Sequence, residues 1–187
     1  MIVTFSGVPC SGKSTIADKV SERLGWKRKS LGDLMKRMAA ERGMNMNDFY
    51  DQLGDDPELE KSMDMRQKRW GDNEDNFIID GRISFYFMPK EKSYNIFFDL
   101  PLEIAAERSY KRGEEGKGER FRSVEKAKES IAYRIENERK HYRELYGINH
   151  LDKSNYDLVV DADKDPETIL EEVYAKIDEE RKRRGEY

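Results

Sequence analysis

The stretch Gly7-Val8-Pro9-Cys10-Ser11-Gly12-Lys13-Ser14-Thr15 carries the strongest signal in the sequence. It matches the pattern G-x-x-x-x-G-K-[ST], follows the apolar run of residues 2–5, and precedes apolar residues at helical spacing. A strand, a loop and a helix in this order direct backbone N–H groups and the positive end of the helix toward one anion. The stretch therefore predicts a loop that binds the phosphates of a nucleotide.

The fixed positions of this loop have separate physical roles. Gly7 and Gly12 permit backbone dihedral angles that other residues rarely adopt. Lys13 can reach the β- and γ-phosphates, and the hydroxyl of Ser14 is placed to ligate Mg²⁺. We expect all nine residues to contact the nucleotide. Cys10 is the only cysteine of the chain, which excludes an internal disulfide, and we expect it to be a small filler.

The composition describes one polar domain. A chain of 187 residues can bury one substantial core, and its clear apolar periodicity argues against disorder although 40% of its residues are charged. The formal net charge of −4 gives no electrostatic footprint for duplex nucleic acid. No apolar stretch approaches the ~18 residues of a membrane span. We therefore expect a single cytoplasmic domain over residues 1–187, monomeric and without nucleic-acid or membrane partners.

Strand and helix patterns alternate along the chain. We expect strands at residues 2–5, 26–30, 77–79, 94–100 and 157–161. We expect helices from the loop to about residue 24, from 31 to about 41, from Pro57, from Pro101, from Ser123 to about 145, and from Asp165. This alternation predicts an α/β fold with a five-stranded parallel sheet and helices on both faces.

Charged residues follow the carboxyl ends of the expected strands, where open α/β sheets bind ligands. After the second strand, Asp33 could bind substrate or simply cap the following helix, which also presents Lys36 and Arg37. After the third strand, Asp80 is placed to hold Mg²⁺ through water, and Arg82 could bind a second phosphate.

An acidic, helical segment separates these two strands. Asn47 is a candidate cap for a short helix in it, and Arg66 is a candidate inward-pointing cation among its carboxylates. The aromatic residues 84–87 that follow could stack on a base, but we expect them to pack in the core.

The fourth helix leads into a charged, glycine-rich loop at residues 113–120. This loop is either a flexible surface connection or a lid over the phosphates, and Arg108 and Arg112 at its base favour a lid. We expect the long helix after it to bury an apolar stripe, Ala127, Ile131, Ile135, Tyr142 and Leu145. Its charged positions Arg134, Arg139 and Arg143 could reach a substrate, but charged positions on such a helix usually face solvent, and we expect the two histidines His141 and His150 to do so as well.

Taken together, these segments resemble the cytidylate kinases, specifically the short, archaeal-type branch of the P-loop nucleoside monophosphate kinases. The resemblance covers nearly the full length and rests on GVPCSGKST (7–15), SLGDLMKRMAAERGM (30–44), MDMRQK (63–68), DGR (80–82), AERSYKRG (106–113), RELYGI (143–148) and NYDLVVDAD (155–163). It implies a three-layer P-loop kinase fold with a helical acceptor-binding insertion at 31–76 and a lid at 108–122.

The resemblance also implies Mg²⁺-dependent transfer of the γ-phosphoryl group of ATP to CMP or dCMP. The loop, residues 7–15, would hold ATP, while Ser14 and, through water, Asp80 would hold Mg²⁺. The implied catalytic residues are Lys13, Asp80, Arg82, Arg108 and Arg112. The implied acceptor-binding residues are Asp33, Lys36, Arg37, Arg66 and Arg82.

Two departures from the family pattern leave other activities open. The family usually has an arginine three residues after the aspartate of its GD motif, where this chain has Lys36 followed by Arg37, and the lid loop is longer than expected. The acceptor could therefore be AMP, UMP or a small metabolite. A nucleotide-dependent switch protein is a further alternative, but the sequence has no Asn-Lys-x-Asp motif to read guanine.

Overall fold

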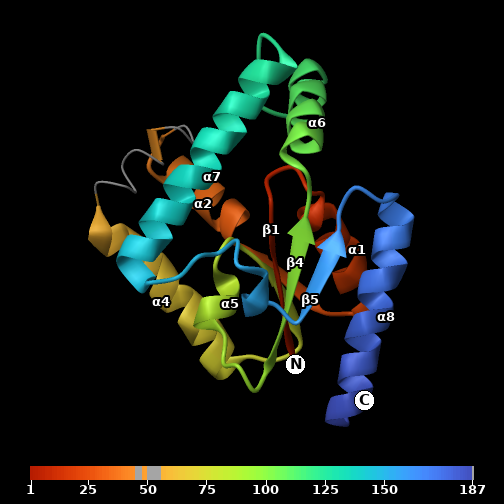
Figure 1. The fold of residues 1–187 in the computed structure, drawn as a ribbon. Coiled ribbons are helices and arrows are strands. Elements are labelled where there is room, and N and C mark those ends of the chain that lie inside the picture. Colours follow the sequence, from red (N-terminus) through yellow and green to blue (C-terminus); the bar gives the residue numbers. More distant parts are fainter. Residues whose placement is uncertain (45–47, 50–55, 187) are drawn as a thin grey trace.

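Five parallel strands form one sheet in the order β2-β3-β1-β4-β5 in the computed structural model, which describes residues 1–44, 48–49 and 56–186 (Figure 1). The strands are β1 (Ile2–Gly7), β2 (Lys27–Ser30), β3 (Phe77–Asp80), β4 (Ser93–Asp99) and β5 (Leu158–Asp161). The prediction of a five-stranded parallel sheet is confirmed. Its central strands, β1 and β3, are buried along their whole length, as expected for strands covered on both faces.

Helices cover both faces of this sheet. They are α1 (Lys13–Leu24), α2 (Leu31–Glu41), α4 (Pro57–Asn73), α5 (Ser84–Phe87), α6 (Leu102–Glu114), α7 (Val124–Tyr146) and α8 (Pro166–Arg184), with a 3-10 turn at Lys153–Asn155. Helices α1 and α8 lie on one side of the sheet and α4 and α5 on the other, while α6 and α7 pair beyond the carboxyl end of β4 (Figure 1). The carboxyl ends of the strands therefore face the space between α7 and α1.

The core divides between the two faces because side chains alternate along a strand. Val3 and Phe5 of β1 pack with Ile78 of β3 in the cluster that includes α1 and α8. Ile2 and Ile79 point the other way, into a cluster with residues of α2 and α4. Apolar side chains thus cover the sheet on both faces. This packing holds the carboxyl ends of the strands in place, including the end of β3 that carries Asp80.

Side chains at the helix starts account for the observed boundaries. Asp56 accepts hydrogen bonds from the backbone N–H groups of Glu58 and Leu59 at the start of α4, and Asp165 caps α8 in the same way. Ser123 caps α7. The predicted cap Asn47 lies outside the described residues. Among the described helices, none combines the length and apolarity needed to cross a membrane.

Two burial predictions for the region after the lid are wrong. His150 is only 2% exposed, because its backbone carbonyl accepts from the hydroxyl of Tyr156 and its ring meets the edge of Tyr142. Leu145 is 50% exposed, because the last turn of α7 packs on α5 through the next residue, Tyr146, whose ring contacts Tyr86 and Phe87.

Candidate active site

The phosphate-binding loop adopts the conformation that its glycines predict. Gly7 has a φ of +141°, and a Cβ atom there would lie 2.3 Å from the carbonyl oxygen of Phe98 on β4. Gly12 has a φ of +79° and immediately precedes α1, and Cys10 also has a positive φ, of +62°. Only glycine allows β4 to approach this closely at Gly7, so the loop is held against the sheet at its first residue.

Hydrogen bonds shape the rest of the loop. The N–H of Val8 donates to Phe98 over 3.1 Å, and the N–H of Ser11 donates back to Val8 over 3.3 Å. The hydroxyl of Ser11 is buried and has no hydrogen-bond partner among the described residues. The first turn of α1 leaves N–H groups without partners within the helix, so this end of the loop can bind an anion.

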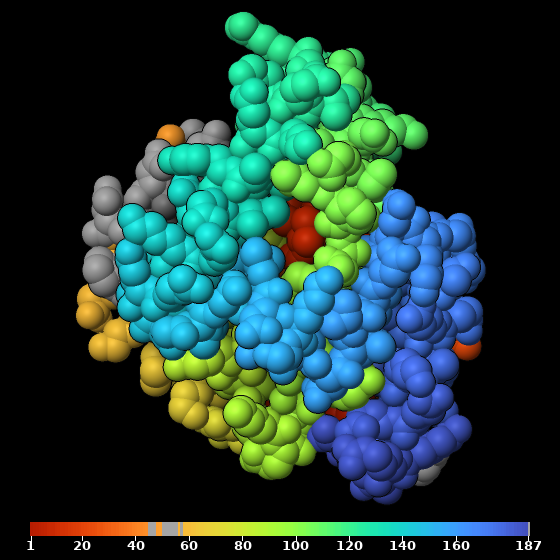
Figure 2. Space-filling view, viewed as in Figure 1, coloured from red at the N-terminus to blue at the C-terminus, as the bar shows by residue number. Residues whose placement is uncertain are grey.

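A cleft of about 980 Å³ opens above the loop. In Figure 2, residues near the N-terminus (red) are visible at the bottom of a hollow that green and cyan segments border. Six of the nine loop residues line the cleft: Cys10, Ser11, Gly12, Lys13, Ser14 and Thr15. Gly7, Val8 and Pro9 are not among its lining residues, and Val8 is buried in the core. The second part of the loop is therefore placed where a nucleotide could contact it, and contact by all nine residues stays a prediction.

Lys13 is the central cation of this cleft. The pKa of its ammonium group is lowered to about 7, mainly by burial and also by the neighbouring positive charge of Arg82, against the opposing effects of Asp80 and Glu138. The lysine is therefore poised to gain a proton when a polyphosphate enters, since negative charge close to the ammonium favours its charged form.

Arg82 is held in position by α7 and by the loop. Its Nε donates to Oε2 of Glu138 over 2.8 Å, and its Nη1 donates to the carbonyl oxygen of Gly7 over 3.2 Å. Oε1 of the same glutamate accepts from Nε of Arg134 over 2.9 Å. Burial alone would raise the pKa of Glu138, but the charges of Arg82 and Arg134 outweigh it and hold that pKa below its ordinary value. One buried carboxylate thus fixes two guanidinium groups at the edge of the cleft.

Arg28 makes the second ionic centre, and it joins three carboxylates. It forms ion pairs with Asp80 through Nη2, with Asp18 at 3.0 Å and with Asp33 at 3.6 Å. Asp80 lies opposite Phe5 of β1 in the sheet register, so the pair sits beside the phosphate-binding loop. The predicted metal ligand Asp80 is therefore already bound to a cation, through one of its two oxygens.

Asp33 is not the cap of α2. That role belongs to Ser30, whose hydroxyl accepts from the N–H of Asp33 over 3.2 Å. The carboxylate of Asp33 instead accepts from Lys36 over 3.0 Å, and this hydrogen bond lowers its pKa. Asp33 and Lys36 both line the cleft.

The arginines at the base of the predicted lid also line the cleft. Arg108 donates to the carbonyl oxygen of Ala162 over 2.9 Å, and Arg112 reaches the carbonyl oxygen of Lys117 at 3.4 Å. The loop after α6 folds back onto that helix, since a Cβ atom at Gly113 would lie 2.3 Å from the carbonyl oxygen of Glu119. Arg108 is partly exposed and also pairs with Asp163 at 3.4 Å, whereas Arg112 is exposed.

Two predicted substrate-binding cations are not brought to the cleft. Arg37 is exposed on α2 and is not one of the lining residues. Arg66 is also exposed, and its guanidinium lies over the ring of Trp70, 5.8 Å from the centroid. The interpretation of Arg66 as an inward-pointing cation is wrong because it lies on the outer side of α4. Residues 84–87 do not line the cleft either: Phe85 and Phe87 pack against the core clusters, as expected, whereas Tyr86 is 46% exposed.

Sequence reasoning missed several residues of the cleft. Arg28 lies in a polar strand with no motif around it, and Glu138 lies in a helix rich in charge, in which only its partner Arg134 was named as able to reach a substrate. Only the spacing of four residues between Arg134 and Glu138 could have suggested a pair. The other lining residues that were not predicted as part of a site include Glu60, Met63, Asp64, Gln67 and Tyr142, of which Tyr142 was expected only in the apolar stripe of α7.

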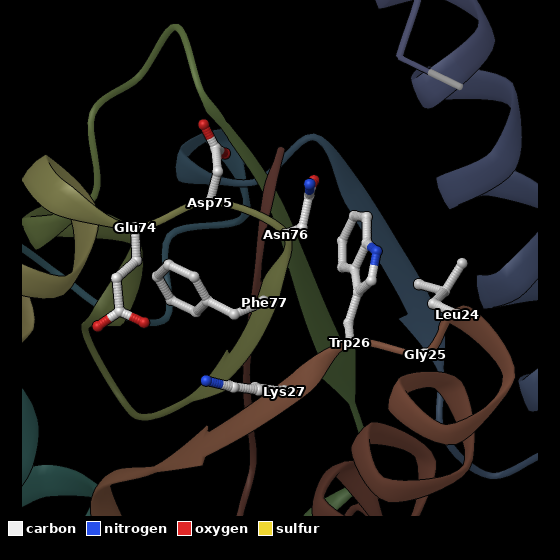
Figure 3. Close-up of a pocket in the computed structure, with 8 residues that line it drawn as sticks. All are labelled: Leu24, Gly25, Trp26, Lys27, Glu74, Asp75, Asn76 and Phe77. Carbon is white, nitrogen blue, oxygen red and sulfur yellow. The ribbon is translucent and has the colours of Figure 1, made fainter.

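A second cavity, of about 550 Å³, lies at the amino ends of strands β2 and β3, where residues 24–27 and 74–77 line it (Figure 3). Its acidic side chains are already bonded within the protein. Glu74 accepts from Lys29 at 2.8 Å, and Asp75 pairs with the N-terminal ammonium at 2.8 Å. The cavity is remote from the phosphate-binding loop, and we assign no ligand to it.

The donor groups around the loop suit Mg²⁺ held mainly by a substrate. No group of three or more His, Cys, Asp and Glu side chains that could hold a metal ion occurs in the described part of the chain. Ser14 and Asp80 line the same cleft, and Mg²⁺ commonly uses one or two protein oxygens together with phosphates and water. The residues present fit that kind of site.

Comparison with known proteins connects this cleft to a family. Residues 2–164 match the model of the cytidylate kinase-like family. Cytidylate kinases from Pyrococcus horikoshii and Halorubrum lacusprofundi are 36% and 32% identical over 179 residues, which is 95% of this chain and 88% and 90% of theirs.

The chain is also similar in fold to solved structures of low sequence identity, and this similarity concerns the fold alone. A shikimate kinase from Bacteroides thetaiotaomicron matches with a TM-score of 0.65 and 11% identity, over 95% of this chain and 98% of its own. The shikimate kinase from Aquifex aeolicus matches with a TM-score of 0.58 and 20% identity, over 96% and 98%. The predicted three-layer P-loop kinase fold is thereby confirmed. On the sequence match over most of its length, the chain belongs to the cytidylate kinase-like family.

Proposed function

We propose that this protein transfers the γ-phosphoryl group of ATP to CMP or dCMP and produces ADP with CDP or dCDP. One observation carries the proposal. The same cleft is lined by the phosphate-binding loop and by three arginines from outside the loop, Arg28, Arg82 and Arg134. Two phosphate-bearing molecules can therefore meet in it. The curated relatives named cytidylate kinases support CMP as the acceptor.

The donor half consists of the loop and the first turn of α1. Backbone N–H groups after Gly12 would bind the β-phosphate, and Lys13 would neutralise the charge shared with the γ-phosphate. Because burial lowers the pKa of Lys13 to about 7, binding of ATP would fix the proton on this lysine. The unpartnered hydroxyl of Ser11 is a further donor for the bound phosphates.

The acceptor half needs no general base, because the phosphate of a nucleoside monophosphate is already an anion. Arg82 would bind this phosphate and hold it in line with the γ-phosphoryl group, with Glu138 fixing the direction of the guanidinium. Arg108 and Arg112 would approach from the lid side and stabilise the charge on the transferring group. An arginine in that position contributes on the order of 10³ to 10⁵ in rate.

Ser14 and, through water, Asp80 would hold Mg²⁺ against the ATP phosphates. When bound, Mg²⁺ would neutralise negative charge that develops on the phosphates during the transfer. Arg28 fixes the Asp80 carboxylate through one oxygen and leaves the other free to accept from a metal-bound water.

The proposal can be tested with a coupled assay of ADP release. Wild-type protein with ATP and Mg²⁺ should turn over CMP, whereas AMP, UMP and small metabolites should be poor acceptors. Lys13→Ala should lower kcat at least a thousandfold, and Lys19→Ala, an exposed lysine of the same helix that pairs with Glu167, should not. Loss of activity with EDTA and its return with Mg²⁺ would support the metal site.

Two outcomes would favour other functions. Turnover of a different acceptor in place of CMP would assign another kinase activity. No phosphoryl transfer to any acceptor, combined with nucleotide-dependent partner binding that Lys13→Ala abolishes, would favour a switch protein.

We also propose that the protein is a monomer. Its mass in solution, measured by light scattering, should then be near 22.1 kDa.

A further inference from the structure

Arg82 lies just beyond the point where the pairing of β1 with β3 ends. The parallel register of these strands ends with Phe5 opposite Asp80, and the N–H of Gly81 then donates to the carbonyl oxygen of Phe5 over 3.1 Å. Strand β1 continues beside β4 as far as Gly7. The backbone of Arg82 therefore lies outside the sheet ladder, and a contact of another kind must fix it.

The side chain of Ser6 supplies this contact from the central strand. Its hydroxyl donates to the carbonyl oxygen of Arg82 over 2.6 Å, and Ser6 is only 1% exposed. The carbonyl oxygen of the next residue, Gly7, accepts from Nη1 of Arg82 over 3.2 Å. Two consecutive residues, where β1 passes into the phosphate-binding loop, thus hold both the backbone and the side chain of one arginine.

A buried tyrosine orients the Ser6 hydroxyl. Tyr156 lies two residues before β5, and its hydroxyl hydrogen is shared between the carbonyl oxygen of His150, at 2.6 Å, and Oγ of Ser6, at 3.2 Å. A serine hydroxyl has one hydrogen to donate and lone pairs to accept. Because Ser6 accepts from Tyr156, its own hydrogen is left directed at Arg82.

The direction of the Arg82 guanidinium depends on both ends of its side chain. Glu138 holds the far end, through the hydrogen bond from Nε of Arg82, and Ser6 holds the backbone from which the side chain starts. An arginine side chain has many rotamers, so a contact at one end alone leaves the guanidinium several positions. A displacement of about 1 Å at a reacting group can cost about 100-fold in rate.

We infer that Ser6 is a positioning residue of the phosphoryl transfer. Its hydroxyl holds the backbone of Arg82 so that the guanidinium meets the acceptor phosphate in line with the donor phosphates on the loop, and Tyr156 orients that hydroxyl. The inference rests on the proposed function, because it requires Arg82 to bind the acceptor phosphate. Neither Ser6 nor Tyr156 is among the residues that line the cleft, so both act through Arg82 and not on the substrate.

Thr4 provides a matched control on the same strand. Its side chain lies on the same face of β1 as that of Ser6, is buried, and donates to Oδ1 of Asn95 on β4 over 2.8 Å. Ser6→Ala and Thr4→Val each remove one buried hydroxyl, but only the first removes a contact to Arg82. The measurements are urea unfolding, kcat/KM for CMP at saturating ATP, and the dissociation constant of a non-hydrolysable ATP analogue.

Both variants should lower the urea midpoint by about 0.5 M, because each loses one buried hydrogen bond. Ser6→Ala should also lower kcat/KM for CMP by about tenfold and change the dissociation constant of the ATP analogue by less than about twofold. Thr4→Val should change both quantities by less than about twofold. Equal kinetics for the two variants overturn the inference. A loss of ATP-analogue binding in Ser6→Ala as large as the loss in kcat/KM also overturns it, because Ser6 would then act on the loop.

Tyr156→Phe tests the second residue of this chain of contacts. It removes the hydroxyl and keeps the ring, whose centroid lies 4.9 Å from those of Phe85 and Phe97. The change should lower kcat/KM for CMP by about threefold in wild type and leave it unchanged in Ser6→Ala, since its effect requires the Ser6 hydroxyl. The same loss in both backgrounds overturns the role of Tyr156. A wild-type protein that phosphorylates no nucleoside monophosphate would instead refute the proposed function, and this inference with it.

Discussion

Replacing Glu138 with glutamine should damage both stability and acceptor use, whereas the same change two residues earlier should not. Glu138 is 17% exposed and accepts from Arg82 at 2.8 Å and from Arg134 at 2.9 Å. Glu136 is 62% exposed and, among the residues that the structure describes, pairs with Arg139 alone, at 2.9 Å. Both changes remove one charge from the same helix, so their comparison isolates the buried contacts.

The expected magnitude follows from these two hydrogen bonds. A hydrogen bond to a charged acceptor is worth roughly 1 kcal/mol more than one to a neutral amide, so Glu138→Gln should lower the free energy of unfolding by about 2 kcal/mol. Glu136→Gln should lower it by less than about 0.5 kcal/mol. With a urea m-value of about 2 kcal/mol/M, the unfolding midpoints should fall by about 1 M and less than about 0.25 M.

Kinetics should separate the same two variants. If a loss of about 2 kcal/mol is carried into the transition state, Glu138→Gln lowers kcat/KM for the acceptor by about 30-fold. Binding of ATP should change little, because the donor half is held by the loop. Equal stability and equal kinetics for the two variants would refute the view that Glu138 orients Arg82.

Two further predictions concern Gly7 and His150. Gly7→Ala should destabilise the protein by about 3 kcal/mol, because its Cβ would lie 2.3 Å from a backbone oxygen at a φ of +141°. Gly25→Ala should cost about 1 kcal/mol, because Gly25 has a φ of +66° but open space around its Cβ position. Equal shifts in the urea midpoint for the two variants would contradict this. Burial lowers the pKa of His150 to about 4, below the 6.5 of the unfolded chain, so protonation favours unfolding. The free energy of unfolding should therefore fall by about 1.5 kcal/mol more in wild type than in His150→Asn between pH 6.5 and 5, and parallel pH profiles would count against a neutral buried ring.

The sheet and the phosphate-binding loop could be predicted from the sequence because their signals are local. A continuous apolar run such as residues 77–79 is typical of a strand covered on both faces, and the two glycines of the loop required the positive φ values that they have. The order of these segments then determines which polar residues follow strand ends. Asp33, Asp80 and Arg82 were found in this way.

Pairing across the cleft could not be predicted, because the partners are far apart in the sequence. Arg28 and Asp80 are 52 residues apart, and Arg82 and Glu138 are 56 apart. Nothing near Glu138 distinguishes it from the exposed Glu136 in the same charged helix. Their difference comes from how α7 lies against the end of β3.

The exposure of two residues, His150 and Arg66, could not be predicted from the sequence either. His150 has polar neighbours in the sequence, yet its ring contacts the aromatic ring of Tyr142 and its backbone carbonyl accepts from the hydroxyl of Tyr156. Arg66 lies among carboxylates on α4, where helical phase decides which side faces the cleft, and it faces outward over Trp70. In both cases tertiary packing, and not local composition, decides the exposure.

The most direct test of the central claim is transfer of label from [γ-³²P]ATP to an acceptor in a competition among equal concentrations of CMP, dCMP, UMP and AMP. We predict that labelled CDP and dCDP form in the presence of Mg²⁺ and that labelled UDP and ADP remain minor products. Label that appears mainly in ADP or UDP, or that reaches no acceptor in a protein that binds ATP, would contradict the account.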